Sequence, residues 1–545
     1  MEASGFGKVQ FANKNLTNPA SDMQITTCSD ASGRSVTFSS KKFHATALAG
    51  LLPIAHIARS LNLFKAAKEV LSDAVPSKRN TLYSPELMFE QRLLALAAGY
   101  EDLNDHDELF HDPGFTGALG TANMASSATL FRFENGFDRH SINALNETLL
   151  SAFIDADRRL GLLPRIRRKK YRCLFLDVDS TYIKLYGNQE KKSYNGHYQC
   201  CCLAPVLCYL HGYPIAVYGA AGTSDARKVL EHYLPRLLKR IQKAFPDYII
   251  VLRADSGFNS NALIETCQKL GAHYIMGFPP IKAAQQAIYS KGLKYAKRKQ
   301  AKRYTTAGTA AQIIGATDWN AKSWNQPRRV IARKRFDRRT CQLDLRLIQT
   351  SIACTKDSAK EGYAGELSLI TISDMYEKVY CGRGRMEQWV GEFKTQCFGD
   401  RASATKFHAN CYRMILAAYC QMLLKIARRL QYFGVRKANR KATQKTVRTF
   451  RRDVICVTAA VREMRKKLHL TLPEHLHDRQ AFEALFFHSN IERPERPQLV
   501  VPRFRGKGQL RSLGGVNAGF ILPVNISHSQ DDFRQPLAAG FDSFV

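Results

Sequence analysis

The sequence has little that would place the chain in a membrane or in an oxidising compartment. It has 545 residues, yet no stretch reaches about eighteen uninterrupted apolar residues, the length expected of a membrane-spanning helix. The first fifty residues have no charged start followed by an apolar run, so no secretory leader is indicated. The 14 cysteines include no Cys-x-x-Cys pair and fit reduced thiols. These absences predict a cytoplasmic protein.

The densest group of cysteines does not resemble a zinc site. Cys200, Cys201 and Cys202 are adjacent, and Cys208 follows within the same apolar run. Neighbouring residues of a strand point to opposite faces, so vicinal cysteines cannot converge on one metal ion. A strand is therefore predicted here.

Acidic residues are scarce relative to basic ones. The chain has 81 Lys and Arg against 47 Asp and Glu, which gives a formal net charge of +34. Such a field attracts polyanions, and phosphates along a duplex favour many Lys and Arg contacts through counterion release. Nucleic acid is the expected partner, although a basic ribosome-associated protein would have a similar composition.

The chain is too long for one ordinary core, and no internal repeat is visible. Shifts in composition and periodicity divide it into six expected parts. They are a poorly ordered segment (1–40), a helical domain (41–165), an α/β region (166–280), a basic β-rich insertion (281–365), a second part of the α/β region (366–430) and a basic C-terminal region (431–545).

Local signals support the helical domain. Pro53 is expected to break the helical pattern that runs from His44 to Leu71. Pro85 stands where a helix accepts a first-turn proline, and Ser126 can cap the helix that follows it.

Strand-like runs alternate with helical ones after Tyr171, which predicts an α/β sheet. The expected strands are 173–179, 198–210, 213–219, 248–255, 273–278 and 367–373. The expected helices are 226–244, 261–270 and a strongly helical region over 375–430.

The stretch from Ile281 to Arg346 has a different character. It contains 17 Lys and Arg but three acidic residues, together with Trp319 and Trp324, two of the three tryptophans. Short β-like runs, such as 329–332 and 343–349, predict a small β-rich insertion.

Two aspartates lie at the ends of apolar strand-like runs. Asp179 ends the first run and Asp255 ends the run from Tyr248. Phosphodiester cleavage by two metal ions needs hard oxygen ligands that converge from separate elements, and strand ends can supply them. The alternative is that each Asp caps the turn after its strand, because a Ser follows both. Asp177 shares the parity of Asp179, so both can face the same side.

A helix-like segment carries a third set of polar residues. Tyr380, Arg383, Glu387 and Lys394 fall within roughly 60° on one face of a regular α-helix. A separate apolar stripe contains Met386, Val390, Phe393 and Cys397. A solvated face with an i,i+4 Arg-Glu pair is the alternative, but it explains neither the tyrosine in register nor the three nearby glycines, which lower helix propensity.

The spacing Tyr-(2)-Arg-(3)-Glu-(6)-Lys resembles the signature of one branch of bacterial insertion-sequence transposases. These are cut-and-paste DDE enzymes of the RNase H-like superfamily. The segments 176–181 and 253–258 resemble the first and second Asp motifs of this family, and 125–135 and 401–413 also resemble this branch. The resemblance covers roughly residues 40 to 470.

The resemblance implies an α/β fold with an RNase H-like catalytic core, interrupted by the β-rich insertion and flanked by helical DNA-binding regions. It implies that Asp179, Asp255 and Glu387 are the catalytic residues and bind two Mg²⁺ ions, with Mn²⁺ as a possible substitute. Asp179 is preferred over Asp177 because the family's Asp directly precedes the Ser/Thr pair. The DNA-binding residues would be Tyr380, Arg383 and Lys394 on phosphates, with Trp319 and Trp324 stacking on a flipped base. A core role for both tryptophans is an equal alternative.

The implied partners are double-stranded DNA, as terminal inverted repeats and target, and a second copy of the chain. The implied location is the bacterial cytoplasm, in association with the nucleoid. Three alternatives stay open: a catalytically silent DNA-binding protein derived from such an enzyme, another RNase H-like DNA nuclease, and a purely structural nucleic-acid protein, which the net charge suits but the strand-end aspartates do not.

Overall fold

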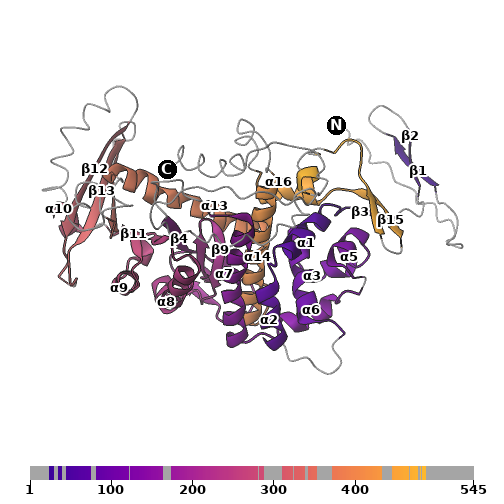
Figure 1. The fold of residues 1–545 in the computed structure, drawn as a ribbon, viewed down its shortest axis with the longest axis horizontal. Coiled ribbons are helices and arrows are strands. Elements are labelled where there is room, and N and C mark those ends of the chain that lie inside the picture. The colour runs from indigo at the N-terminus through magenta and orange to yellow at the C-terminus, as the bar shows by residue number, and fades with distance from the viewer. Residues whose placement is uncertain are drawn as a thin grey trace, which may run out of the picture.

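The computed structural model describes most of the chain between Gln24 and Leu485. The described residues are 24–29, 35–39, 44–74, 82–163, 173–287, 310–352, 371–431 and 445–485, apart from short gaps at 122, 280, 323, 338–341, 465–466, 477–478 and 480–481. Figure 1 shows helices gathered at one end, a large sheet toward the other, and the long helix α14 (Phe407–Leu430) between them.

The helical part consists of short helices followed by one long one. They are α1 (Leu51–Ser60), α2 (Lys65–Ala74), α3 (Pro85–Ala98), α4 (Asp105–Leu109), α5 (Pro113–Leu119), α6 (Ser127–Glu134) and α7 (Arg139–Leu160). Pro85 does begin α3, and the Ser84 hydroxyl accepts a hydrogen bond from Leu87 N. The break predicted at Pro53 is wrong. Pro53 lies in the first turn of α1, where a backbone N–H would have no partner within the helix.

The largest sheet has eight strands in the order β12-β13-β14-β11-β10-β4-β8-β9. Its strands are β4 (Cys173–Ser180), β8 (Val206–Leu210), β9 (Tyr213–Tyr218), β10 (Ile249–Ala254), β11 (His273–Phe278), β12 (Ala310–Trp319), β13 (Arg328–Asp337) and β14 (Gln342–Thr350). Strands β4, β10 and β11 are parallel neighbours, whereas β8 and β9 continue the sheet antiparallel. The predicted α/β class is confirmed at this level.

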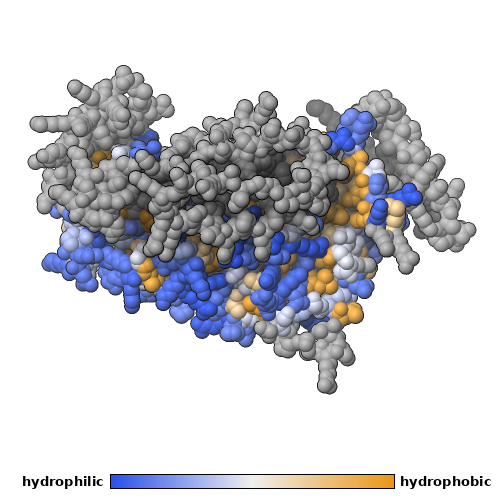
Figure 2. All heavy atoms as spheres, in the orientation of Figure 1, coloured by the Kyte–Doolittle hydropathy of each residue, from blue (hydrophilic) through white to orange (hydrophobic). Residues whose placement is uncertain are grey.

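Both faces of the sheet are covered. Even-numbered residues of β4, such as Leu174 and Leu176, belong to the main core, and α8 (Ala226–Ala244) and α9 (Asn261–Lys269) cover that face. Odd-numbered residues, such as Phe175, face the segment that begins at Met375. The outward side of α8 is largely hydrophilic (Figure 2). One continuous apolar core includes α14, the helical part and the even face of β4.

The strands expected at 329–332 and 343–349 are present as β13 and β14, and both are longer than predicted. They continue the large sheet, since β14 pairs antiparallel with β11. The short helix α10 (Lys282–Ala287) precedes them. The hairpins therefore share one sheet with the strands that carry Asp179 and Asp255.

The run predicted as one strand over 198–210 is two strands in two sheets. It divides at Ala204 and Pro205 into β7 (Cys200–Leu203) and β8, and β7 lies in a small sheet of order β5-β7-β6. Its partners are β5 (Ile183–Lys184) and β6 (Ser193–Asn195). The prediction of a strand at the cysteines holds, but not that of a single continuous strand.

Other expectations near the ends of the chain are modified. Strands β1 (Gln24–Ser29) and β2 (Ser35–Ser39) pair within the segment predicted to be poorly ordered. Of the strand expected at 367–373, residues 367–370 lie outside the described part and Ile372–Asp374 form the short helix α12.

Part of the basic C-terminal region packs onto the helical part. It contains α16 (Val447–Phe450), the π-helical turn η7 (Arg451–Ile455), β15 (Ala459–Met464) and β16 (Lys467–Thr471). Strand β15 pairs with β3 (Ala45–Thr46), and the Arg451 guanidinium donates to the carbonyls of Leu96 and Ala97. Within the residues described, no helix combines the length and apolarity needed to span a membrane.

Candidate active site

Two carboxylates meet on the face of the large sheet that also carries Phe175. Asp179 lies near the end of β4, and Asp255 follows β10 directly. The register pairs Asp177 with Arg253 across these parallel strands, so Asp179 and Asp255 continue along the same side. A single guanidinium joins them: Arg383 Nη2 lies 3.0 Å from Asp179 Oδ2 and 3.5 Å from Asp255 Oδ2.

Each aspartate also accepts a hydrogen bond from a backbone N–H at or just after the end of its strand, as the capping alternative expects. Asp179 Oδ1 accepts from Ser180 N at 2.9 Å, and Asp255 Oδ1 accepts from Gly257 N, also at 2.9 Å, at the start of the turn η1 (Ser256–Phe258). In both residues the other oxygen faces Arg383. The cap therefore fixes the carboxylate while leaving one oxygen directed into the site.

Asp177 has a different environment from Asp179. Its side chain is fully buried, and its two oxygens accept from Arg253 Nε at 2.7 Å and Arg253 Nη2 at 2.8 Å. Arg253 also donates to the Val379 carbonyl and lies over the Phe175 ring. The Asp177–Arg253 pair thus ties two strands to the helical segment above them, which leaves Asp179 as the aspartate of β4 that can reach a ligand.

The electrostatics of Asp179 favour a bound cation. Burial raises the pKa of Asp179 to about 6, the Arg383 guanidinium opposes this, and the charges of Asp255 and Glu387 add to the rise. A carboxylate that is both desolvated and close to like charges is stabilised by any cation placed beside it.

Arg383 has unused hydrogen-bonding capacity. Its side chain is 13% exposed, and its buried Nε–H has no hydrogen-bond partner among the described residues. Buried donors are almost always paired, and this one lies in a charged site where a ligand would supply the partner. A phosphate oxygen matches both the charge and the planar fork of a guanidinium.

The segment that carries Arg383 is helical but irregular. It consists of π-helix η3 (Met375–Tyr380), 3₁₀-helix η4 (Cys381–Gly384), α13 (Arg385–Gly391) and π-helix η5 (Glu392–Gln396). The prediction of one regular helix is therefore wrong in detail. Each change of turn alters the angle between successive side chains, and π-turns are frequent at functional sites.

The four signature residues consequently have different surroundings. The Tyr380 hydroxyl lies over Gly277, where a Cβ would come within 2.9 Å of it. Arg383 contacts the two aspartates, whereas Glu387 is exposed. Lys394 Nζ lies 4.1 Å from the centroid of the Tyr182 ring. Among the described ion pairs Arg383 is joined to Asp179 and Asp255 and not to Glu387, so the i,i+4 alternative is not what the structure shows.

The residues predicted to bind two Mg²⁺ ions fit in part. Asp179 and Asp255 offer hard carboxylate oxygens that already share one cationic partner. Within the described ranges, no three His, Cys, Asp or Glu side chains are close enough to form a metal site. Glu387 is near enough to influence the pKa of Asp179 but does not join the pair. The donor chemistry fits a divalent ion, and the third carboxylate stands outside the cluster.

Buried contacts of Trp389 anchor the helix that carries Glu387. Its carbonyl accepts from Gln421 Nε2 at 2.8 Å, and its ring lies 4.9 Å from Lys425 Nζ. Lys425 also donates to the carbonyl of Gly212. The φ of Gly212 is +80°, a backbone conformation that glycine adopts more readily than other residues. Desolvation within the fold lowers the pKa of Lys425 to about 7.

Trp319 and Trp324 do not face this site. Their ring centroids are 4.9 Å apart, and both pack against Phe278. Phe278 and Val330 belong to one apolar cluster of the sheet. Ile275 and Ile331 point to the opposite face of the sheet, where they pack beneath η3. The structure brings the tryptophans together, partly buried and on the other face from Arg383.

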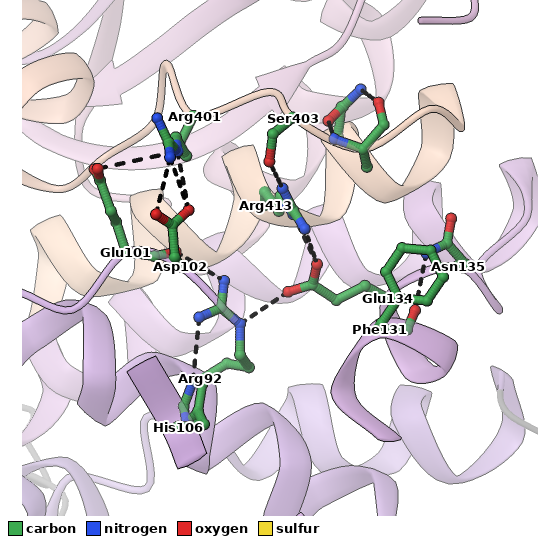
Figure 3. Close-up of polar contacts among 12 residues, drawn as sticks. Arg92, Glu101, Asp102, His106, Phe131, Glu134, Asn135, Arg401, Ser403 and Arg413 are labelled. Carbon is green, nitrogen blue, oxygen red and sulfur yellow. Dashed lines mark hydrogen bonds and ion pairs between the residues drawn. The ribbon is translucent and has the colours of Figure 1, made fainter. Parts of the chain in front are cut away.

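A buried ion network joins the two remaining motif stretches (Figure 3). Glu134, which is fully buried, accepts from Arg92 Nε at 2.8 Å and from Arg413 Nε at 2.7 Å. His106 lies 3.2 Å from Arg92, and burial lowers the pKa of His106 to about 3, so the ring is neutral. Nearby, Arg401 forms an ion pair with Asp102. The network fixes the helical part to α14 and to the loop that follows Lys394.

Sequence reasoning did not identify Arg253, Tyr198 or Tyr182. Arg253 lies two residues before Asp255, just as Asp177 lies two residues before Asp179. This equal spacing on two neighbouring strands could have predicted that Arg253 and Asp177 face each other. No comparable signal existed for the tyrosines, because their contacts depend on how the small sheet meets the helix.

The fold and the site together define a class: an α/β protein with paired carboxylates at the carboxyl ends of neighbouring parallel strands and an arginine between them. The sequence model of the family described as "Transposase DDE domain group 1" matches residues 29–493, and the chain belongs to this family. No curated protein matches the chain. The family implies an enzyme that acts as a nuclease or transposase, and DDE transposases generally use divalent metal ions.

Proposed function

We propose that the chain is a DNA transposase that binds the terminal inverted repeats of an insertion sequence and catalyses strand cleavage and strand transfer. The observation that carries the proposal is the placement of Asp179 and Asp255 on neighbouring parallel strands, both within 3.5 Å of Arg383. Membership of the DDE transposase family supports it.

The catalytic core in this proposal is RNase H-like. Its strands would be β9, β8, β4, β10 and β11, of which the first three are antiparallel and the last two continue parallel to β4. Strands β12 to β14 would then be the insertion between Asp255 and Glu387, attached to the edge of that core.

We assign the metal-binding and catalytic roles to Asp179, Asp255 and Glu387. Two Mg²⁺ ions, or Mn²⁺, would activate water and later a 3′-hydroxyl and would stabilise the leaving oxygen. The carboxylates of Asp179 and Asp255 would hold the ions from the sheet, and Glu387 would complete the site from α13. This last role requires Glu387 to turn toward the pair from its exposed position.

Arg383 would change partner when DNA binds. Asp179 and Asp255 would hold divalent ions in its place, and the Arg383 guanidinium would then be free to hold a phosphate through its planar fork. Its unpaired Nε–H is the donor that such a phosphate would satisfy. Tyr380 and Lys394 would position neighbouring phosphates from either side of Arg383 along the same helical segment.

DNA binding beyond the site is assigned to the helical part and the basic C-terminal region. The net charge of +34 supplies the electrostatic attraction. The working unit would be a homodimer on DNA, because two transposon ends must be cut and joined together.

The test is a pair of assays on the full-length chain with DNA that carries the natural ends of the element. Asp179→Ala and Asp255→Ala should abolish strand cleavage and leave end binding nearly intact. If Asp179→Ala cleaves normally while Asp177→Ala does not, the first carboxylate is misassigned. If the unmodified chain binds ends without cleaving them in Mg²⁺ or Mn²⁺, the chain is a silent DNA-binding protein.

A further inference from the structure

The strand after Asp179 presents an exposed row of aromatic and cationic side chains. Along β5 and the residues beside it, Tyr182, Lys184 and Tyr186 are exposed, whereas Ile183 and Leu185 between them are buried. Tyr186 is 82% exposed and Tyr182 is 37% exposed. The buried positions fix the strand on the core, so the row has a defined outward direction.

This row is continuous with the candidate active site. The Tyr182 and Tyr198 rings lie 4.6 Å apart, and Lys394 Nζ is 4.1 Å from the Tyr182 ring. Tyr182 follows Asp179 by three residues, just beyond the end of β4, so the row begins beside the site. The path from Asp179 to Tyr186 is therefore lined by rings and ammonium groups.

The charge around the row suits a polyanion. Between Thr181 and Gln199 the chain has three lysines and one acidic residue, Glu190. The Glu190 carboxylate accepts from Phe407 N at 2.9 Å, which partly neutralises it at the start of α14. Aromatic rings interleaved with lysines form the surface that single-stranded nucleic acid binds, because bases stack on the rings and phosphates meet the cations.

The two tyrosines are not equivalent. The ring of Tyr182 contacts both the ring of Tyr198 and the ammonium of Lys394, so it is already engaged. Tyr186 has Lys184 Nζ 5.1 Å from its ring centroid and keeps most of its surface in solvent. Tyr186 is therefore the residue that can accept a base, and Lys184 is placed to meet the adjoining phosphate.

We propose that Tyr186 and Lys184 form a binding site for unpaired nucleotides of the DNA strand that passes out of the active site. Tyr186 stacks on a base, Lys184 pairs with its phosphate, and Tyr182 keeps the row rigid. The proposal rests on the proposed function for the identity of the strand as DNA. Binding itself requires no cleavage, so the two can fail separately.

The test measures binding of a fluorescein-labelled oligothymidine, and of a duplex of equal length, to the full-length chain in EDTA. Tyr186→Ala should weaken single-strand binding by about 5- to 150-fold, which corresponds to the stacking of one base. Tyr186→Phe keeps the ring and should bind as the unmodified chain does. Lys184→Ala should reduce the salt slope of single-strand binding by about 0.7, the share of one phosphate.

Tyr194→Ala is the matched control. Tyr194 is 60% exposed on β6 of the same small sheet. Lys184 and Ser193 are both in register with Cys202, so Tyr194 points to the other face. The control should bind both DNAs normally, and thermal melting should show every variant folded.

Three results would overturn the proposal. Tyr186→Ala could bind the single strand as tightly as the unmodified chain, it could weaken duplex and single strand equally, or Tyr194→Ala could show the same loss. Normal single-strand binding by the unmodified chain, together with absent cleavage in Mg²⁺, would count against the proposed function alone.

Discussion

Replacing Asp179 with Asn tests the electrostatics of the site without DNA. The folded-state pKa of Asp179 is about 6, against an ordinary value of 3.8. Because the folded value is the higher one, the unfolded chain releases its proton first as the pH rises. The charge of Asp179 therefore costs stability progressively between these two values, and the full cost is present above about pH 6.

The magnitude follows from the size of the shift. A rise of about two pKa units corresponds to about 3 kcal/mol, and the attraction of Arg383 is already included in it. The side chain is 16% exposed, so solvent screening is limited. Asn resembles the uncharged carboxyl, and Asp179→Asn should thus stabilise the protein by up to about 3 kcal/mol at pH 8 and have little effect near pH 4.

The assay is thermal or urea unfolding of the full chain at both pH values. Asp177→Asn is the matched control, because it removes a charge from the fully buried pair with Arg253 and leaves that guanidinium unpaired. It should destabilise by about 3–5 kcal/mol at pH 8. Equal destabilisation by Asp179→Asn and Asp177→Asn at pH 8 would refute the reasoning.

Two further predictions concern the arginine between the aspartates and the buried ion network. Arg383→Lys keeps the charge but loses the planar fork, so the rate of cleavage of a pre-nicked end substrate should fall on the order of a hundredfold while the melting temperature is retained. Full activity, or simple unfolding, would contradict the role of Arg383 in phosphate binding. Glu134→Gln leaves the charges of Arg92 and Arg413 without their shared partner, so the free energy of unfolding measured by denaturant titration should fall by about 3–5 kcal/mol. An unchanged midpoint of unfolding would show that the network contributes little to stability.

The elements with an uninterrupted period could be predicted from the sequence. Helix α8 and strand β11 have the predicted bounds, and β10 differs by one residue at each end. Helix α8 is an amphipathic segment with the helical period, and β10 and β11 are short apolar runs. In each, local pattern and tertiary packing favour the same structure.

The division at Pro205 shows where this reasoning stops. Residues 200–210 form one apolar run, yet β7 and β8 belong to different sheets. Apolar residues continue through both strands, and the strands differ in their partners. A single sequence does not specify partners that lie far away along the chain.

The irregular helix after Met375 was unpredictable for a related reason. Its π-turns and 3₁₀ turn form where the segment packs against the sheet. There, the Arg253 side chain donates a hydrogen bond to the Val379 carbonyl. The chemistry of Arg383 could be predicted from its spacing, but its two aspartate partners could not. The exposed position of Glu387 likewise had no signal in the sequence.

Under the proposed function, Glu387 completes a catalytic triad with Asp179 and Asp255. Excision in vitro from a plasmid that carries the gene with its natural flanking DNA tests this most directly. Glu387→Gln should abolish excision while end binding persists, and Glu377→Gln, a change at an exposed carboxylate of the same helical segment, should leave excision intact. Excision by Glu387→Gln at the rate of the unmodified chain would contradict the account.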